Sequence, residues 1–338
     1  MKKQSNTFIK SLLFLIIIVL LVYGTKLFKP SQYQNIRIVG SSTAFPFISN
    51  ISEVISKRNP EITIIIETTG TGSGFQLFCQ KNHVNSHPDI VMASRPITTK
   101  ELELCKKNGT DPQEIIFGYD AILILSSSKS ITNLERDDIF LAISEFTPTH
   151  HTLTKNKISY WNEINTSLPK QLIEIYGPPY SSGTRDEMNK LVMNYSCKQS
   201  KFSTAYHNQS LCTSVRRDGR YIETGENENL VIQKLKSNPL ALGILGYNFY
   251  VGNQDLNVVS IDNIYPDFHN ISTFKYPLTR PLYLYFHKKN QKTLKNFMLE
   301  LTKNEFFIQN SHLMKIGLIP PKPEQVENLN KTILNLVK

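Results

Sequence analysis

The chain has 338 residues, of which 40% are hydrophobic and 20% charged, so it is long enough for two domains and too apolar for a disordered protein. Its formal net charge is +10, but the five lysines of residues 1–29 supply half of that and leave +5 on the remainder. A bias of this size attracts anions. It does not indicate a nucleic-acid-binding protein, because no basic stripe interleaved with aromatic residues is present.

The N-terminus has the layout of an export signal. Lysines precede the apolar run of residues 11–23, which is short for a membrane-spanning helix. Two interpretations stay open: cleavage of a signal peptide after Gly24, and an uncleaved anchor in the inner membrane. In both, residues 1–29 direct the rest of the chain out of the cytoplasm, and we expect a periplasmic protein.

Four cysteines follow the leader: Cys79, Cys105, Cys197 and Cys212. None belongs to a CxxC pair, so a zinc site is not expected. In an exported chain an even number of cysteines favours disulfides. The spacings favour Cys79–Cys105 and Cys197–Cys212, although four cysteines allow three pairings.

From residue 36 onward, apolar strands end in polar Gly/Ser loops, and helices follow these loops. This order predicts an α/β fold with a largely parallel sheet. The predicted strands are residues 36–39, 62–67, 89–92, 118–125, 172–176, 243–247 and 282–287. The predicted helices are residues 47–57, 75–80, 134–143, 185–194, 229–236, 291–302 and 324–337.

Four of these loops carry hydroxyl side chains where a strand meets a helix. The first turn of a helix has unpaired N–H groups and a partial positive charge, and glycine lets a ligand approach the backbone closely. A single serine or threonine there is more often a plain helix cap, but four such loops in one chain favour oxyanion binding. The loops are Ser41-Ser42-Thr43, Gly72-Ser73-Gly74, Ser94-Arg95 and Ser182-Gly183-Thr184-Arg185.

Other kinds of site have weaker support. No loop fits the GxxxxGK[ST] nucleotide motif, and Ser182 is not in a GxSxG elbow. The pair His150-His151 has no suitable third ligand nearby, and we interpret it as an exposed loop. We therefore expect neither a metal nor a cofactor.

Seven motifs follow one another between residues 38 and 286: IVGSSTAFPF, TTGTGSGF, PDIVMASRPIT, GYDAILIL, IYGPPYSSGTRDEM, NPLALGILGYNFY and YPLTRPLYLYF. In this order they resemble the motifs of the periplasmic phosphate-binding proteins (PstS type) of phosphate ABC transporters. Each motif is weak by itself, and the agreement in order makes the set specific.

The resemblance implies a bilobal periplasmic-binding-protein type II fold, with two α/β lobes and a ligand cleft between them. Lobe one would comprise residues 36–117 plus 247–338, and lobe two residues 118–246. A monomer without catalytic activity would capture inorganic phosphate in the cleft and deliver it to the inner-membrane permease of a phosphate ABC transporter.

The same resemblance implies which residues hold the phosphate. The turn at residues 43–45 would donate backbone N–H groups, the serines and threonines would donate hydroxyls, and residues 182–184 would cap the anion from lobe two. The implied ligands are Ser42, Thr43, Ala44, Phe45, Ser73, Ser94, Arg95, Ser182, Gly183, Thr184 and Arg185.

Two departures from the family pattern concern charge. Arg95 stands where some members carry an aspartate that accepts the phosphate proton, which puts the rejection of sulfate in doubt. Pro178 stands where some members carry an arginine. Arg95 and Arg185 are our candidates for balancing the anion, and a salt bridge at the cleft rim is the alternative for both. Arg216 and Arg217 are weaker candidates.

Two alternative functions remain open. The same fold could serve as a receptor or sensor for sulfate or another tetrahedral oxyanion. An exported phosphatase would use Ser182 or Thr184 as its nucleophile, and it would need a neighbouring base or a metal cluster.

Overall fold

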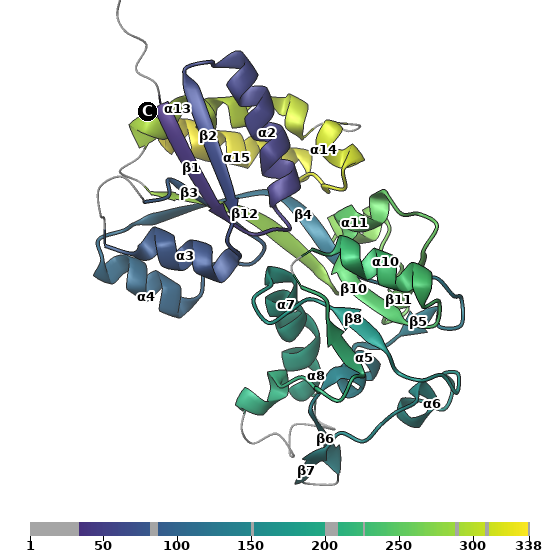
Figure 1. The fold of residues 1–338 in the computed structure, drawn as a ribbon. Coiled ribbons are helices and arrows are strands. Elements are labelled where there is room, and N and C mark those ends of the chain that lie inside the picture. The colour runs from purple at the N-terminus through teal and green to yellow at the C-terminus, as the bar shows by residue number, and fades with distance from the viewer. Residues whose placement is uncertain are drawn as a thin grey trace, which may run out of the picture.

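The computed structural model describes residues 34–81, 87–149, 152–199, 209–225, 227–287, 291–307 and 311–336. These residues form two α/β lobes, one above the other in Figure 1. The predicted leader, residues 1–29, and the pair His150-His151 lie outside the described residues. Within the described part of the chain, no helix combines the length and the apolar character needed to cross a membrane.

The first lobe contains a mixed sheet in the strand order β2-β1-β3-β12-β4. Strand β1 (Gln34–Gly40) is parallel to β2 (Ile62–Thr68) and to β3 (Ile90–Ala93). Strand β12 (Thr279–His287) runs antiparallel to β3 and to β4 (Pro112–Ser126).

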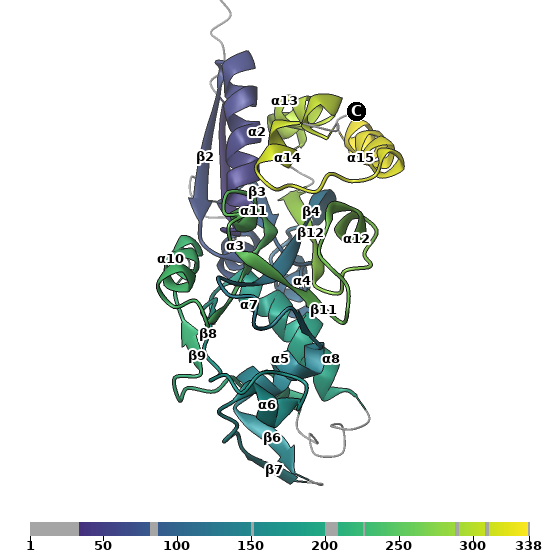
Figure 2. The same cartoon turned by 90° about the vertical axis from the view of Figure 1, so that its right-hand side faces the viewer.

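Side chains of these strands alternate between two faces, and each face has its own core. On one face, Leu282 and Leu284 of β12 pack with α2, α13 and α15. On the other, Tyr283 and Tyr285 pack with α3 and α4. Figure 2 shows the helices of both layers. The helices are α2 (Phe45–Arg58), α3 (Thr71–Cys79), α4 (Thr99–Lys107), α13 (Gln291–Leu301), α14 (His312–Lys315) and α15 (Pro323–Leu336), with a short turn at Asn304–Phe306.

Strand β4 is shared by the two lobes. Residues 112–121 pair with β12, and residues 122–126 pair with β10 (Leu242–Gly246) and β11 (Asn257–Ile261). Every residue from Phe117 to Ser126 is buried. The strand therefore runs through the middle of the molecule and joins the two sheets into one of ten strands.

In the second lobe the sheet continues as β4-β10-β8-β9. Strand β8 (Ile175–Gly177) is parallel to β10 and to β9 (Tyr221–Glu223), and β11 pairs with β5 (Asn133–Leu134). A hairpin of β6 (Phe146–Thr149) and β7 (Thr152–Lys155) lies at the far end of this lobe (Figure 1). The helical segments are α5 (Arg136–Ile143), α6 (Trp161–Ile164), α7 (Gly183–Met188), a π-helical turn at Asn189–Met193, α8 (Asn194–Cys197), a turn at Gln209–Thr213, α10 (Asn229–Ser237), α11 (Tyr247–Val251) and α12 (Phe268–Ser272).

The hydrophobic cores place the second crossing between lobes later in the chain than residue 246. Leu256, Val259, Ile271 and Tyr276 are buried in the same core as β10, whereas Leu282 belongs to a core of the first lobe. Residues 247–278 thus pack with the second lobe, although the resemblance assigned them to lobe one. We propose that lobe two comprises residues 122–278.

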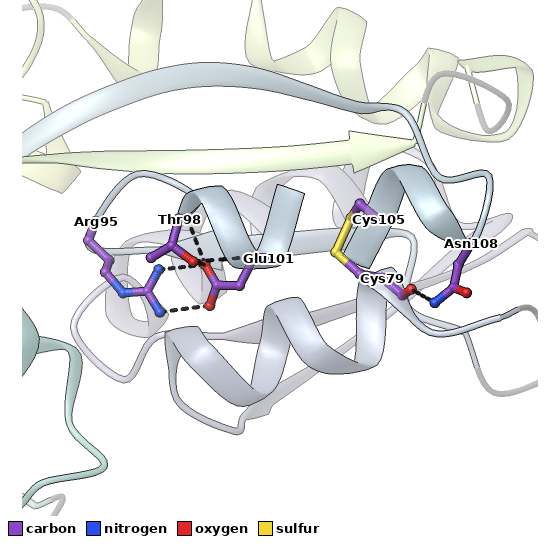
Figure 3. The surroundings of a disulfide bond; sticks show 6 residues. All are labelled: Cys79, Arg95, Thr98, Glu101, Cys105 and Asn108. Carbon is purple, nitrogen blue, oxygen red and sulfur yellow. Dashed lines mark hydrogen bonds and ion pairs between the residues drawn. A yellow bond between two sulfur atoms is a disulfide. The ribbon is translucent and has the colours of Figure 1, made fainter. Parts of the chain in front are cut away.

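The structure confirms the α/β class and the bilobal fold, with local differences. The helix predicted at residues 75–80 begins at Thr71, because Gly70 (φ 79°) turns the chain directly after β2. Both expected disulfides are present: Cys79–Cys105 joins α3 to α4, and Cys197–Cys212 joins α8 to the turn at residues 209–213. Figure 3 shows the first of them.

Candidate functional site

A buried ion pair lies where the two crossing strands meet. Arg280 of β12 is directly opposite Asp120 of β4 in the antiparallel register, and both side chains are fully buried. Nε and Nη2 of Arg280 lie 3.0 and 2.7 Å from Oδ2 of Asp120. The N–H of Tyr247 donates to Oδ1 of Asp120 at 3.1 Å. Because buried charges need such partners, this pairing fixes the guanidinium at the lobe junction.

The other donors of Arg280 reach hydroxyl groups from both lobes. Nη2 lies 3.3 Å from Oγ1 of Thr43, at the start of α2, and Nη1 lies 3.1 Å from Oγ1 of Thr184, in α7. The two hydroxyl oxygens are 3.4 Å apart, and both threonines are buried. Arg280 therefore marks the point where the β1–α2 loop of lobe one meets the β8–α7 loop of lobe two.

A second contact between the lobes involves Thr71, Ser94 and Gly183. Oγ1 of Thr71 lies 3.4 Å from Oγ of Ser94, and neither residue is exposed. Gly183 of lobe two packs directly on this pair: a Cβ there would overlap Oγ of Ser94 and lie 3.2 Å from Oγ1 of Thr71. Glycine is thus required for this approach.

Serine side chains accept from backbone N–H groups where the two helices meet at the junction: Ser182 caps α7, and Ser41 binds the turn before α2. Oγ of Ser182 accepts from the N–H of Thr184 at 3.2 Å. Oγ of Ser41 accepts from the N–H groups of Thr43 and Ala44 at 3.2 and 3.4 Å. The amides of Thr43 and Ala44, which we expected to hold the anion, are therefore partly engaged by Ser41.

Glu228 is a buried carboxyl group beside Thr184. The Thr184 hydroxyl donates to Oε1 of Glu228 at 2.9 Å, and the N–H of Gly246 donates to Oε2 at 2.7 Å. Burial raises the pKa of Glu228 above its ordinary value, although the nearby Arg280 opposes this rise. A raised pKa favours the neutral acid. The site therefore carries less negative charge than it would if both Asp120 and Glu228 were ionised.

We call this set of residues the interlobe cluster. Its members share burial and a place at the lobe junction. They are Thr43, Thr71, Ser94, Asp120, Gly183, Thr184, Glu228 and Arg280.

Arg95 lies near the interlobe cluster but is engaged in salt bridges. Its Nη atoms contact both carboxylate oxygens of Glu101 at 2.9 and 2.8 Å, and its Nε reaches Asp186 of α7 at 3.1 Å. Glu101 also takes part in the capping box of α4 with Thr98 (Figure 3). Burial lowers the pKa of Arg95, but Glu101 and Asp186 outweigh this effect and leave it raised. Arg95 thus makes the salt bridge between lobes that was the alternative to anion binding.

Arg185 contacts a different set of groups. Its Nη1 lies 3.2 Å from the carbonyl oxygen of Pro178, 3.0 Å from the Tyr221 hydroxyl and 3.4 Å from Glu223. None of these partners belongs to the interlobe cluster.

The other expected ligands differ in how far they are buried. Thr43, Ser94, Ser182, Gly183 and Thr184 are buried at the junction. Ser73 is exposed on α3, and Thr71 of the same loop occupies the buried position instead. Ser42 is half-buried, and Phe45 is 37% exposed.

Sequence reasoning missed Arg280, Asp120, Thr71 and Glu228. A signal was present for two of them. Asp120 is a lone acid in an apolar strand, and Arg280 lies two residues before the predicted apolar strand of residues 282–287, so each needed a partner of opposite charge. Glu228 lies in a polar run, GENENL, that gives no comparable signal.

Comparison with known sequences identifies a family. Residues 29–305 match the family described as the PBP superfamily domain. Protein SphX of Synechocystis sp. is 29% identical over 333 residues, which cover 94% of this chain and 87% of SphX. The phosphate-binding protein PstS of Staphylococcus saprophyticus is 28% identical over 265 residues, which cover 76% of this chain and 72% of PstS.

Solved structures support the same fold. A possible phosphate-binding protein from Planctomyces limnophilus superposes with a TM-score of 0.61 at 23% identity, covering 90% of this chain and 99% of that chain. A putative phosphate ABC transporter substrate-binding protein from Clostridium perfringens, solved with bound phosphate, gives a TM-score of 0.62 at 18% identity, covering 85% of this chain and all of that chain. At these identities the likeness concerns the fold.

Proposed function

The chain belongs to the PBP superfamily, and we propose that it is an extracytoplasmic receptor that captures inorganic phosphate between its lobes and delivers it to an ABC transporter permease. One observation carries this proposal: Arg280, fully buried at the lobe junction, is surrounded by hydroxyl groups from loops of both lobes. Relatives named phosphate-binding proteins and a structural neighbour with bound phosphate support the choice of ligand.

The chemistry of the interlobe cluster suits a desolvated tetrahedral oxyanion. Arg280 supplies positive charge, while Thr43, Thr71, Ser94 and Thr184 supply hydroxyl donors. Hydrogen bonds to an ionised acceptor are about twice as strong as neutral ones. Several such donors, converging on one desolvated anion, would offset the loss of its hydration.

The protonation state of Glu228 would decide whether the Thr184 hydroxyl can donate to the anion. When Glu228 is ionised, the Thr184 hydroxyl donates to it, as observed at 2.9 Å. When Glu228 is protonated, it can donate to Thr184, whose own hydrogen is then free for the anion. Phosphate capture therefore favours the neutral acid at this position.

Lobe closure completes the site, because its donors come from both lobes. Gly183 packs on Ser94, and Arg95 bridges to Asp186, only when the lobes are in contact. A ligand that contacts both lobes stabilises this closed state over an open one.

Export to the periplasm agrees with two features of the chain. The leader at residues 1–29 has the composition of an export signal, and the disulfides Cys79–Cys105 and Cys197–Cys212 require an oxidising compartment. We also propose that the protein is a monomer, that it has no catalytic activity, and that it delivers phosphate to a permease.

Calorimetric titration of the purified protein with phosphate, arsenate and sulfate tests the ligand. We expect saturable binding of phosphate and arsenate, and weaker binding of sulfate. Absence of any phosphate binding would contradict the proposal, and tighter binding of sulfate would favour the alternative receptor.

A phosphatase assay tests the enzymatic alternative. Within the interlobe cluster, the contact of Thr184 with Glu228 resembles a nucleophile beside a base. We expect no release of phosphate from a chromogenic ester. Release that disappears in Thr184→Val would favour the enzyme.

A further inference from the structure

A cavity in the second lobe, separate from the interlobe cluster, is also lined by arginines. It has a volume of about 840 Å³ and lies along β9 and the segment of residues 213–219. No member of the interlobe cluster lines it. We propose that this cavity is a second ligand site, which binds an organic phosphate monoester through Arg185 and Arg217.

Arg185 is a buried cation whose charge is only partly compensated. It is 4% exposed, and its nearest carboxylate, Glu223, lies 3.4 Å away and is itself 48% exposed. Its Nε has no hydrogen-bond partner among the described residues. Its closer contacts, with the Pro178 carbonyl oxygen and the Tyr221 hydroxyl, are neutral, and a buried charge without a close counter-charge is costly. An oxyanion in the cavity would supply the missing negative charge, and Arg185 lines that cavity.

Arg217 gives the cavity a second cation. Its side chain is exposed and lines the same cavity, and no salt bridge joins it to another described residue. Arg216, by contrast, is held by both oxygens of Asp218, at 2.8 and 2.6 Å, and by the carbonyl oxygen of Ala142 at 3.3 Å. Arg185 and Arg217 are thus the two arginines of the lining that no carboxylate among the described residues holds through two oxygens.

The rest of the lining indicates a monoester with hydroxyl groups rather than a bare inorganic anion. The volume falls in the range of pockets for small organic ligands and far exceeds what one tetrahedral oxyanion fills. The carboxylates of Glu145 and Glu223 also line the cavity, and they can accept hydrogen bonds from the hydroxyl groups of an organic ligand. Thr213 and Ser214 add hydroxyls of their own.

The test uses glycerol 3-phosphate as the probe, titrated calorimetrically into protein already saturated with inorganic phosphate. We expect a second saturable binding event in the unaltered protein. Arg185→Gln and Arg217→Gln should each weaken it by at least about tenfold, as expected for losing one charged contact. Because Arg217 is exposed, its substitution leaves the fold intact. The control Thr43→Val, in lobe one, should weaken inorganic phosphate and leave glycerol 3-phosphate unchanged.

Three outcomes would overturn the second site: no heat from glycerol 3-phosphate, heat that vanishes when inorganic phosphate is saturating, or binding that both arginine variants retain. The two proposals can be told apart in the same sample. Failure of inorganic phosphate to bind would contradict the proposed function, and the glycerol 3-phosphate titration would still decide this inference.

Discussion

Thr71 and Ser73 belong to one Gly-rich loop but differ in exposure, and a desolvated anion needs donors that water does not reach. Thr71 is fully buried beside Ser94, while Ser73 faces solvent. We predict that Thr71→Val weakens phosphate binding by roughly 1–3 kcal/mol, about 5- to 150-fold in Kd, because one buried donor is lost. Ser73→Ala, the matched control, should leave the Kd measured by calorimetry unchanged. If Ser73→Ala weakened binding and Thr71→Val did not, Ser73 would be the hydroxyl donor to phosphate.

Glu228 predicts a pH dependence of binding. Its pKa is already raised by burial, and a bound anion would raise it further, so binding takes up a proton. The affinity should therefore fall as the pH rises through the pKa of Glu228 in the ligand-free protein. Asp120 and Arg280 are the charged groups that face Glu228.

Glu228→Gln isolates this effect from the ionisation of phosphate itself. Glutamine imitates the neutral acid, since it can accept from Gly246 and donate to Thr184. We expect the variant to show a flatter dependence of Kd between about pH 5 and pH 8. Identical slopes in the two proteins would show that Glu228 does not titrate on binding.

The free energy of unfolding of the ligand-free protein should also decrease as the pH rises. The pKa of Glu228 is higher in the folded protein than in the unfolded chain. The contribution of Glu228 to stability is therefore fully present when the pH is below its pKa in the unfolded chain. It is lost as the pH rises through the folded value. Glu228→Gln should remove this loss in urea denaturation measured across that range.

Residue-level reasoning from sequence found three of the four hydroxyl donors of the interlobe cluster, but it missed Thr71 and the charged residues. Thr43, Ser94 and Thr184 follow strands, where loop chemistry is readable. Arg280 and Asp120 meet only because β12 pairs with β4 in one register, and a single sequence does not display that pairing between distant segments.

Strand β4 illustrates which elements were predictable. Its apolar half was evident as residues 118–125, but residues 112–117 include the polar Gln113 and Glu114 and were missed. The prediction also began too late at β12, at residue 282 after Pro281, although the strand begins at Thr279 and includes Arg280. Pairing with neighbouring strands overrides local propensity at both places.

The disulfide Cys197–Cys212 links two short segments of the second lobe that have little regular structure of their own. It closes a loop with a sequence separation of 15 residues. We predict that replacing both cysteines with alanine lowers the free energy of unfolding by about 3 kcal/mol, chiefly through the entropy of the unfolded chain. Urea denaturation at equilibrium measures this change. An unchanged midpoint would mean that the α8 region is ordered without the bridge.

Contacts between the lobes decide how far the closed state is populated. Arg95 is fixed to Glu101 in lobe one and reaches Asp186 in lobe two, so this bond exists only after closure. We predict that Asp186→Asn weakens phosphate binding roughly two- to fivefold, a small effect because Asp186 is 39% exposed.

The control for this prediction is Asp255→Asn. Asp255 pairs with Lys236 at 3.0 Å inside lobe two, and its side chain is 62% exposed. Its substitution should leave the Kd unchanged. Equal effects of the two substitutions would indicate general electrostatics rather than closure.

The division into lobes depends on long-range packing more than on local sequence. The resemblance implied the bilobal architecture, and we propose from the shared core that residues 247–278 belong to lobe two. Their apolar side chains gave no sign of which core they join, because the hydrophobic effect favours burial without specifying the partner.

A crystal structure of the protein with inorganic phosphate tests the interlobe site most directly. We predict one phosphate whose oxygens lie within hydrogen-bonding distance of Arg280 and of the hydroxyls of Thr43, Ser94 and Thr184. Phosphate bound elsewhere, with the interlobe cluster unchanged, would contradict capture between the lobes.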